Sequence, residues 1–358
     1  MSMIGKLFGR GAKLVEVDPE SDIFNKETEG LSQGQIVRKR FLRHRGAMIS
    51  LLVLISLVLF VFSTLGFKIF GFGYGGWWKY NITDLPELRT KGCSIQLPGC
   101  PTLDLRPGKN FGLGDHPFGQ DDLGRDYFAL VMRGAERSIE VMVVIGLVAG
   151  FLGIVVGSIA GFYRGVIDAT LMRFVDFIIT IPILVIGSVL GYHFGSKGVL
   201  FLALFLGLVS WGGLSRLVRG DFLTLREREF VDAARVAGAS NRRIIFKHIL
   251  PNAIGVIIVN VTLIMSGAIL LEAALSYLGF GVVPPDVSLG LLISQYQDSF
   301  TTRPWLFWYP GLIIITVALS VNFIGDGLRD AFDPRQRRRI SRKDRAAERL
   351  TMAKKQRR

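Results

Sequence analysis

Residues 47–70 read AMISLLVLISLVLFVFSTLGFKIF, and this stretch decides the class of fold. Its apolar side chains would cover a helix on every side, which is typical of a segment that faces lipid. A helix rises about 1.5 Å per residue, so about twenty apolar residues cross a hydrocarbon layer of about 30 Å. The stretch therefore predicts a membrane-spanning helix.

The rest of the chain continues this pattern. Of its 358 residues, 50% are hydrophobic, and the formal net charge is +14. The mean hydropathy of +0.40 would make a soluble domain hard to keep in solution. Five further apolar runs lie at 138–162, 174–192, 198–217, 253–272 and 308–327. The sequence thus predicts an all-α membrane protein with six transmembrane helices.

The basic residues indicate how the chain is oriented. Residues 328–358 carry thirteen Lys and Arg against four acidic residues, whereas residues 71–137 are nearly neutral. Cationic segments beside membrane spans stay in the cytoplasm, so the N-terminal segment 1–46 and the basic tail 328–358 are both expected there. Residues 71–137 then form an extracytoplasmic insertion. Because the charges flank spans, a nucleic-acid partner is not expected. The first span lacks a cleavage site and is expected to remain uncleaved.

The predicted insertion contains both cysteines of the chain. Cys93 and Cys100 would lie on the oxidising side of the membrane, and Pro98 and Gly99 between them favour a turn. Pairing them would close a short loop and stabilise it by about 2–3 kcal/mol. We predict a disulfide, with a pair of free thiols as the alternative.

Two spans carry residues that affect helix packing. The second has small residues at spacings of three and four, namely Gly146, Gly150, Gly153, Gly157 and Gly161. Such a stripe lets two helix backbones approach closely, either as a rigid interface within the bundle or as ordinary packing. The third contains Pro182, which removes a backbone hydrogen bond and is expected to kink its helix.

The loop 218–252, within the core region 138–327, is more organised than a connector requires. Its residues 221–252 read DFLTLREREFVDAARVAGASNRRIIFKHILPN. We predict a first short helix near 226–237, with Ala233 and Ala234 on its surface, ended by Gly238. Ser240 would cap a second, basic amphipathic helix. Either docking into a groove on another protein or lying on anionic lipid would suit these helices.

The segments DAARVAGAS and HILPN together resemble the cytoplasmic EAA motif of ABC importer permeases, Glu-Ala-Ala followed after three residues by Gly. The match falls on Asp232, Ala233, Ala234 and Gly238, with Asp in place of Glu. HPFGQDDLGRD at 116–126, SGAILLEAALSYLGFG at 266–281 and NFIGDGLRDAFDPR at 322–335 extend the likeness. From about 36 to 336 the chain is similar to the peptide and nickel permease family, and within it to the dipeptide and oligopeptide C subunits.

The resemblance implies the type I ABC importer permease fold in the bacterial cytoplasmic membrane. It also implies four kinds of partner: a homologous second permease, two ATPase subunits, an extracytoplasmic solute-binding protein and membrane lipid. ATP and Mg²⁺ would be bound by the ATPases, so this chain needs no cofactor or metal and is not an enzyme. Peptide cargo is expected, with nickel chelates or haem-like cargo as alternatives.

The resemblance and the local pattern assign roles to individual residues. Coupling to the ATPases falls on Asp232, Ala233, Ala234, Gly238, Ser240, Arg242, Arg243, His248 and Pro251. A translocation path or gate falls on Ser266, Glu272 and Ser276. For Glu272 the alternative, which we favour, is a solvated carboxylate at the helix end. The acids Asp121, Asp122 and Asp126 with Arg125 serve either binding-protein docking or a helix cap, and we expect the cap.

Two other classes of function are disfavoured. An ion-coupled secondary transporter predicts acidic or histidine relays inside the spans, which are nearly free of such residues. An enzyme predicts a nucleophile with its base, or a metal cluster, and neither is discernible among only four His and two Cys.

Overall fold

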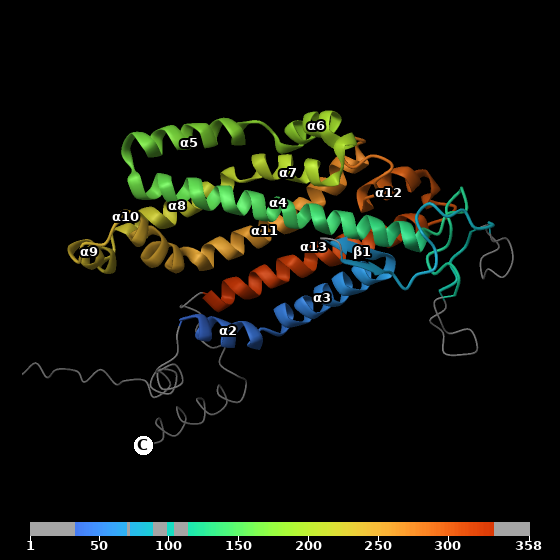
Figure 1. Cartoon of the computed structure of the whole chain (residues 1–358), viewed down its shortest axis with the longest axis horizontal. Coiled ribbons are helices and arrows are strands. Elements are labelled where there is room, and N and C mark those ends of the chain that lie inside the picture. The colour runs from blue at the N-terminus through green and yellow to red at the C-terminus, as the bar shows by residue number, and fades with distance from the viewer. Residues whose placement is uncertain (1–32, 70–71, 89–98, 104–113, 333–358) are drawn as a thin grey trace, which may run out of the picture.

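The computed structural model describes residues 33–69, 72–88, 99–103 and 114–332. They form an elongated bundle in which the long helices run side by side (Figure 1). Four helices are long and apolar enough to cross a membrane, and the number rises to six if two bent helix pairs each count as one crossing. The predicted all-helical membrane class is therefore confirmed within the described residues, apart from one small hairpin.

The first span is α3, Arg45–Leu65, preceded by the basic helix α2, Gln33–Arg43. His44 caps α3, because its Nδ1 accepts a hydrogen bond from the Ala47 N–H at 3.0 Å. The helix stops before residue 70, at Gly66, whose φ of 75° no helix allows. Strand β1, Gly66–Ile69, then pairs antiparallel with β2, Phe72–Gly75. The prediction of a helix through residue 70 is therefore wrong at its end.

The second span, α4, covers Tyr127–Tyr163 and begins well before residue 138. Its early turns contain four charged residues that pair along the helix three positions apart, Arg133 with Glu136 and Arg137 with Glu140. Because these charges interrupt the apolar pattern, the sequence did not indicate that the helix begins before residue 138. Residues 127–137 are thus part of this helix, whereas the prediction placed them in the insertion between the first two spans.

The next two spans are broken. Helix α5, Gly165–Thr180, is followed by α6, Ile183–Phe194, and η1, Gly195–Lys197, with a bend of 78°. Pro182 therefore marks a complete break where a kink was predicted. Helices α7, Val199–Ser210, and α8, Gly212–Arg226, bend by 42° at Trp211.

The remaining elements run from the loop to the last span. They are α9, Glu229–Val236; α10, Asn241–Arg243; the π-helical η2, Ile244–Ile249; α11, Leu250–Tyr277; α12, Leu289–Tyr296; η3, Gln297–Phe300; and α13, Trp305–Phe332. Figure 1 places α2, α9 and α10 at one end of the bundle, and β1 and α12 at the other.

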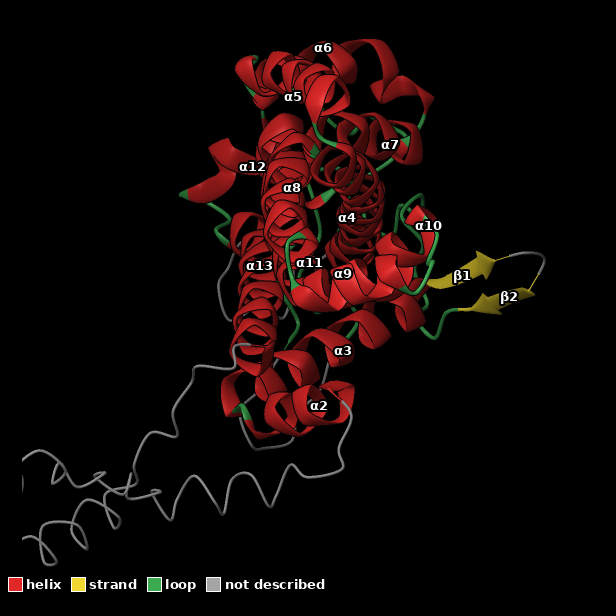
Figure 2. Ribbon diagram, turned by 90° about the vertical axis from the view of Figure 1, so that its left-hand side faces the viewer, coloured by secondary structure: helices red, strands yellow, loops and turns green. Residues whose placement is uncertain are grey.

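Helix α4 lies at the centre, among α7, α8 and α11 (Figure 2). Its glycine stripe is shared between two neighbours. A Cβ at Gly157 would lie 2.5 Å from the Ser215 carbonyl oxygen on α8, and one at Gly146 would lie 2.3 Å from Met265 on α11. Both approaches are too close for any side chain, so the stripe brings α4 against α8 and α11.

Candidate functional site

The predicted coupling segment is built around α9, whose inward face packs on the bundle. Val231 is fully buried and Ala234 is 8% exposed, three positions apart on one side of the helix. They join an apolar group, here called the α9 cluster, that also contains Leu214, Val218 and Phe222 of α8 and Ile244, Ile245 and Ile249 of η2. The cluster fixes α9 to the end of the bundle by apolar contact.

The outward face of α9 carries Asp232 and Ala233, both exposed. Arg235 donates to the Asp232 carboxylate at 2.9 Å, and the Val236 side chain is 91% exposed. Only one alanine of the predicted pair therefore faces out. The expectation that Ala234 lies on the surface is wrong, because the 3.6-residue turn carries it to the side of Val231.

The turn after α9 has the geometry that its residue types predict. Gly238 has a φ of 78°, in the left-handed region, and its N–H donates to the Arg235 carbonyl at 2.9 Å. The Ser240 hydroxyl then accepts from the Arg243 N–H at 3.4 Å and caps α10. Both predicted helix-end signals are confirmed.

The second predicted helix continues without a break into the fifth predicted span. Residues Asn241–Tyr277 form one continuous helical run through α10, η2 and α11, with Pro251 inside it. Arg242, Arg243 and Lys247 are exposed on this run, and His248 is half-buried. Pro251 lies in the first turn of α11, directly after the π-helical turn, and the basic segment continues into a membrane-spanning helix.

Ion pairs and hydrogen bonds bind the end of α8, just before α9, to the rest of the bundle. Arg164, after α4, contacts Glu227 at 2.6 Å, and the Arg226 guanidinium donates to the Phe162 carbonyl. The Arg219 guanidinium also donates to both oxygens of Asp168 on α5, at 2.5 and 2.7 Å. The sequence alone did not indicate these contacts, because no local pattern links two positions that are 51 residues apart, such as Asp168 and Arg219.

The predicted path residues lie in contacts between helices. The Ser266 hydroxyl donates to the Ala318 carbonyl of α13 at 3.1 Å. Glu272 is completely buried and accepts from the hydroxyls of Ser138 at 2.8 Å and Ser276 at 2.7 Å. The alternative of a solvated carboxylate is therefore wrong, while the role of a path or gate stays a prediction. In this chain the three residues join α4, α11 and α13.

At the opposite end of the bundle, Asp126 caps α4 as expected. It is fully buried, and its carboxylate accepts hydrogen bonds from the Ala129 N–H at 3.0 Å and from the Trp78 Nε1–H at 2.7 Å. The same carboxylate lies 2.9 Å from the His116 ring nitrogen Nδ1. Of the predicted cysteine pair, Cys100 is buried and Cys93 lies outside the described residues, so the disulfide stays a prediction.

Asp121 organises a second buried group beside that cap. The Arg125 Nε donates to it at 2.6 Å, and the Tyr296 hydroxyl of α12 donates at 3.0 Å. Burial, and then the Asp121 charge, raise the pKa of the Tyr296 hydroxyl, so it keeps the proton that it donates. Asp122 pairs with Arg303 at the surface.

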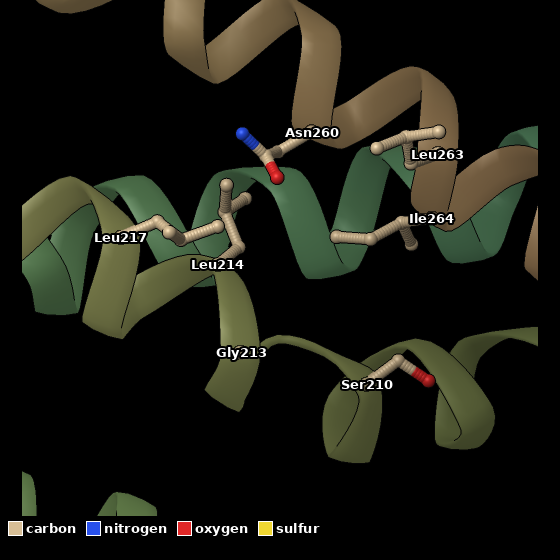
Figure 3. Close-up of a pocket in the computed structure, with 7 residues that line it drawn as sticks. All are labelled: Ser210, Gly213, Leu214, Leu217, Asn260, Leu263 and Ile264. Carbon is tan, nitrogen blue, oxygen red and sulfur yellow. The ribbon is translucent and has the colours of Figure 1, made fainter.

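A cleft opens between α8 and α11, next to the bend at Trp211. Its volume is about 320 Å³, and its walls are Ser210, Gly213, Leu214, Leu217, Asn260, Leu263 and Ile264; we call it the α8–α11 cleft. Figure 3 shows Asn260 on α11 pointing toward Leu214 on α8. Within the described ranges no group of His, Cys, Asp or Glu is placed to hold a metal ion.

Comparison with known proteins identifies the family of this chain. Residues 153–338, which include α8, α9 and η2, match the family described as binding-protein-dependent transport system inner membrane component. The chain belongs to this permease family. Residues 32–70, which include α3, also match the N-terminal TM domain of oligopeptide transport permease C.

Curated relatives of the permease family match over most of their length. The oligopeptide transport system permease protein OppC of Mycobacterium tuberculosis is 37% identical over 87% of this chain and 97% of its own. The protein of the same name from Haemophilus influenzae is 33% identical over 87% and 91%. A putative peptide permease protein of Brucella suis is 36% identical over 85% and 92%.

A solved structure of the MetNI methionine ABC transporter, in inward-facing conformations, also resembles the chain. It is 21% identical, with a TM-score of 0.47, and the match covers 57% of this chain and 96% of that one.

Proposed function

We propose that this chain is a permease subunit of an ATP-driven importer of oligopeptides in the bacterial cytoplasmic membrane, and that α9 couples it to the ATPases. Family membership and the relatives' names support the transport role. The observation that carries the coupling role is the division of α9 into two faces. Val231 and Ala234 fix it to the bundle, while Ala233 and the Asp232–Arg235 pair face outward.

The outward face has the features that docking into a groove requires. An exposed alanine allows a close approach, and the neighbouring charges can set the orientation of the partner. The contacts of Arg164 and Arg226 join the end of α8, which leads into α9, to α4, and Arg219 joins α8 to α5. The α9 cluster packs α9 itself on α8. A pull on α9 would therefore move three helices together. Nucleotide and cargo would each bias this movement by differential binding.

The proposal includes a complete assembly and an orientation. Two ATPases, which hold ATP and Mg²⁺, contact α9 in this chain and its counterpart in a homologous second permease, and a solute-binding protein delivers cargo outside. The two bent helix pairs each cross once, giving six crossings with both termini in the cytoplasm. Residues between α3 and α4 then lie outside, in line with their low net charge.

Among cargoes, oligopeptides are favoured over nickel chelates and haem-like molecules, because the relatives are named for peptides. Family membership also favours this proposal over an ion-coupled transporter. The subunit itself is proposed to be non-catalytic, with hydrolysis left to the ATPases.

Ala233→Arg tests the coupling role. The side chain at Ala233 is exposed, so the substitution should change the stability of the permease by no more than about 0.5 kcal/mol. It would nevertheless obstruct a groove that receives α9. Loss of the ATPases during affinity purification of the permease, together with loss of ATP-driven peptide uptake, is the expected result.

Thr224→Arg is the matched control, because Thr224 is exposed on α8, outside the proposed docking face. It should retain both the ATPases and uptake. Equal recovery of the ATPases with both variants would show that α9 does not dock as proposed.

A further inference from the structure

One side chain that lines the α8–α11 cleft, Asn260 of the membrane-spanning helix α11, carries an amide group. Asn260 lies in the apolar part of α11, where an unpaired amide costs several kcal/mol in hydrocarbon. Its Nδ2 donates to the Val256 carbonyl at 2.8 Å. Its Oδ1 accepts no hydrogen bond within the part of the chain that the structure describes. Asn260 is half-buried, so this oxygen is open to a polar partner that enters the cleft.

The remaining walls limit what that partner can be. Ser210 adds a hydroxyl that donates to the Leu206 carbonyl at 2.6 Å and keeps its lone pairs available. Gly213 leaves its side of the cleft open, since a Cβ there would meet nothing within 4 Å. The other walls are leucine and isoleucine, and no charged side chain lines the cleft. A neutral group with both a donor and an acceptor fits this chemistry best.

A peptide bond has these properties, because it offers one N–H and one carbonyl oxygen. We propose that the α8–α11 cleft binds the main chain of the peptide in transit, with Asn260 as donor and acceptor and Ser210 as an additional acceptor. The inference rests on the proposed import of peptides. Recognition of the main chain by a carboxamide, with no charged wall, would accept many side chains.

The size and position of the cleft agree with this assignment. Its volume of about 320 Å³ would hold about ten waters, at about 30 Å³ each, or a short stretch of main chain. It also adjoins the 42° bend between α7 and α8, where a change of bend would change its width.

The cleft is connected to the proposed coupling helix through side chains in contact. Leu214 forms part of the cleft wall and also belongs to the α9 cluster. Val218 and Phe222 continue that cluster along α8 to Val231 of α9. Movement of α9 would therefore reach the wall opposite Asn260 and could release the main chain that it holds.

Asn260→Leu, tested in the full complex, removes the proposed contact. The complex with its ATPases and binding protein would be reconstituted in liposomes, and ATP-driven uptake measured for trialanine and for trialanine N-methylated at its second peptide bond. In the unsubstituted complex, methylation should lower uptake. In the variant, uptake of trialanine should fall about tenfold, the loss expected for one pair of hydrogen bonds. The ratio of trialanine uptake to methylated-peptide uptake should be clearly smaller in the variant than in the unsubstituted complex.

The same binding protein serves every variant, so its own preference cancels when these ratios are compared. Asn260→Gln keeps the carboxamide and should restore part of the discrimination. Ser210→Ala should lower trialanine uptake by about two- to threefold, as expected for a weaker hydrogen bond. Ser188→Ala is its matched control, because that hydroxyl bonds the Leu184 carbonyl at 2.8 Å on α6, outside the cleft, and uptake should not change.

Three results would overturn the inference. If Asn260→Leu keeps both the rate and the discrimination, the cleft does not hold the main chain, although the importer itself stands. If the variant loses the second permease on purification, the cleft is a contact between subunits. If the unsubstituted complex moves no peptide with ATP, the proposed function fails first.

Discussion

Helices α12 and α9 lie at opposite ends of the bundle (Figure 1). Near α12, buried polar groups satisfy one another, whereas the polar groups of α9 face outward. Asp121 and Asp126 are fully buried, and each bonds to other parts of the same chain. The Asp232 carboxylate of α9 is 64% exposed and, among the described residues, pairs with Arg235 on its own helix. Polar groups at the first end are satisfied within the chain, and α9 at the second end leaves charges exposed, as the proposed docking requires.

Asp126→Ala should have the largest effect on stability. It removes a buried carboxylate that accepts from Trp78 and from the Ala129 N–H, and it leaves those donors without a partner. The expected loss is about 3–5 kcal/mol, measured by thermal unfolding in detergent. Asp122→Ala is the control, because its pair with Arg303 lies at the surface and should contribute about 0–1 kcal/mol. Similar losses from both would contradict the contrast between the two ends.

Gly157→Val tests the close contact of α4 and α8, through which the two ends are joined. A Cβ would come within 2.5 Å of the Ser215 carbonyl oxygen, so the helices must separate. We expect a loss of about 1–3 kcal/mol, together with reduced peptide uptake. Gly220→Ala on α8 meets nothing within 4 Å and should leave stability equal or slightly higher. If the Gly157→Val variant kept its stability and its peptide uptake, the contact between α4 and α8 would not be tight.

Gly238→Val should have a moderate effect, confined to the α9 end. The φ of 78° costs a β-branched residue about 1–2 kcal/mol, although space is available for the side chain. We expect intact membrane insertion with impaired uptake and ATPase recovery. Gly238→Asn should behave nearly as the parent protein, since asparagine adopts this conformation more readily. Equal uptake by the valine variant would mean that the turn is unimportant for coupling.

Asp232→Asn should have the smallest effect on the permease itself. Its pair with Arg235 is exposed and local, so stability should change by less than about 0.5 kcal/mol. If the carboxylate instead orients a partner, the variant should weaken ATPase binding, and the difference should shrink as salt is raised. Titration of the ATPase onto the detergent-solubilised permease at two salt concentrations measures this. A salt-independent difference would point to shape in place of charge.

The parts of the fold that depend on local pattern could be predicted from the sequence. Uninterrupted apolar runs gave α3, α11 and α13, and the residue types at Gly238 and Ser240 gave the turn after α9. Helix limits were less predictable where charged residues pair along a helix, as at the start of α4. The break at Pro182 exceeded the predicted kink, because a proline's effect depends on the neighbours that hold each half.

The site was predictable only in outline. The motif located α9, but the assignment of Ala234 to the buried face depends on where the α9 cluster lies. The burial of Glu272 also could not be foreseen, since its partner Ser138 is 134 residues away. Asn260 was not identified, because a single amide within an apolar run gives no local signal until α8 is placed opposite it.

The π-helical turn η2 has a geometric consequence for this arrangement. Leu250 donates to the carbonyl of Ile245, five residues back, so this segment carries one residue more than an α-helix of the same height. Each residue of an α-helix advances by about 100° around its axis. Deleting one residue from Ile244–Ile249 would therefore rotate α11 by about that angle relative to α9, and Asn260 would turn away from α8. The extra residue thus sets the rotational register between the surface proposed to meet the ATPases and the side chain proposed to meet the cargo.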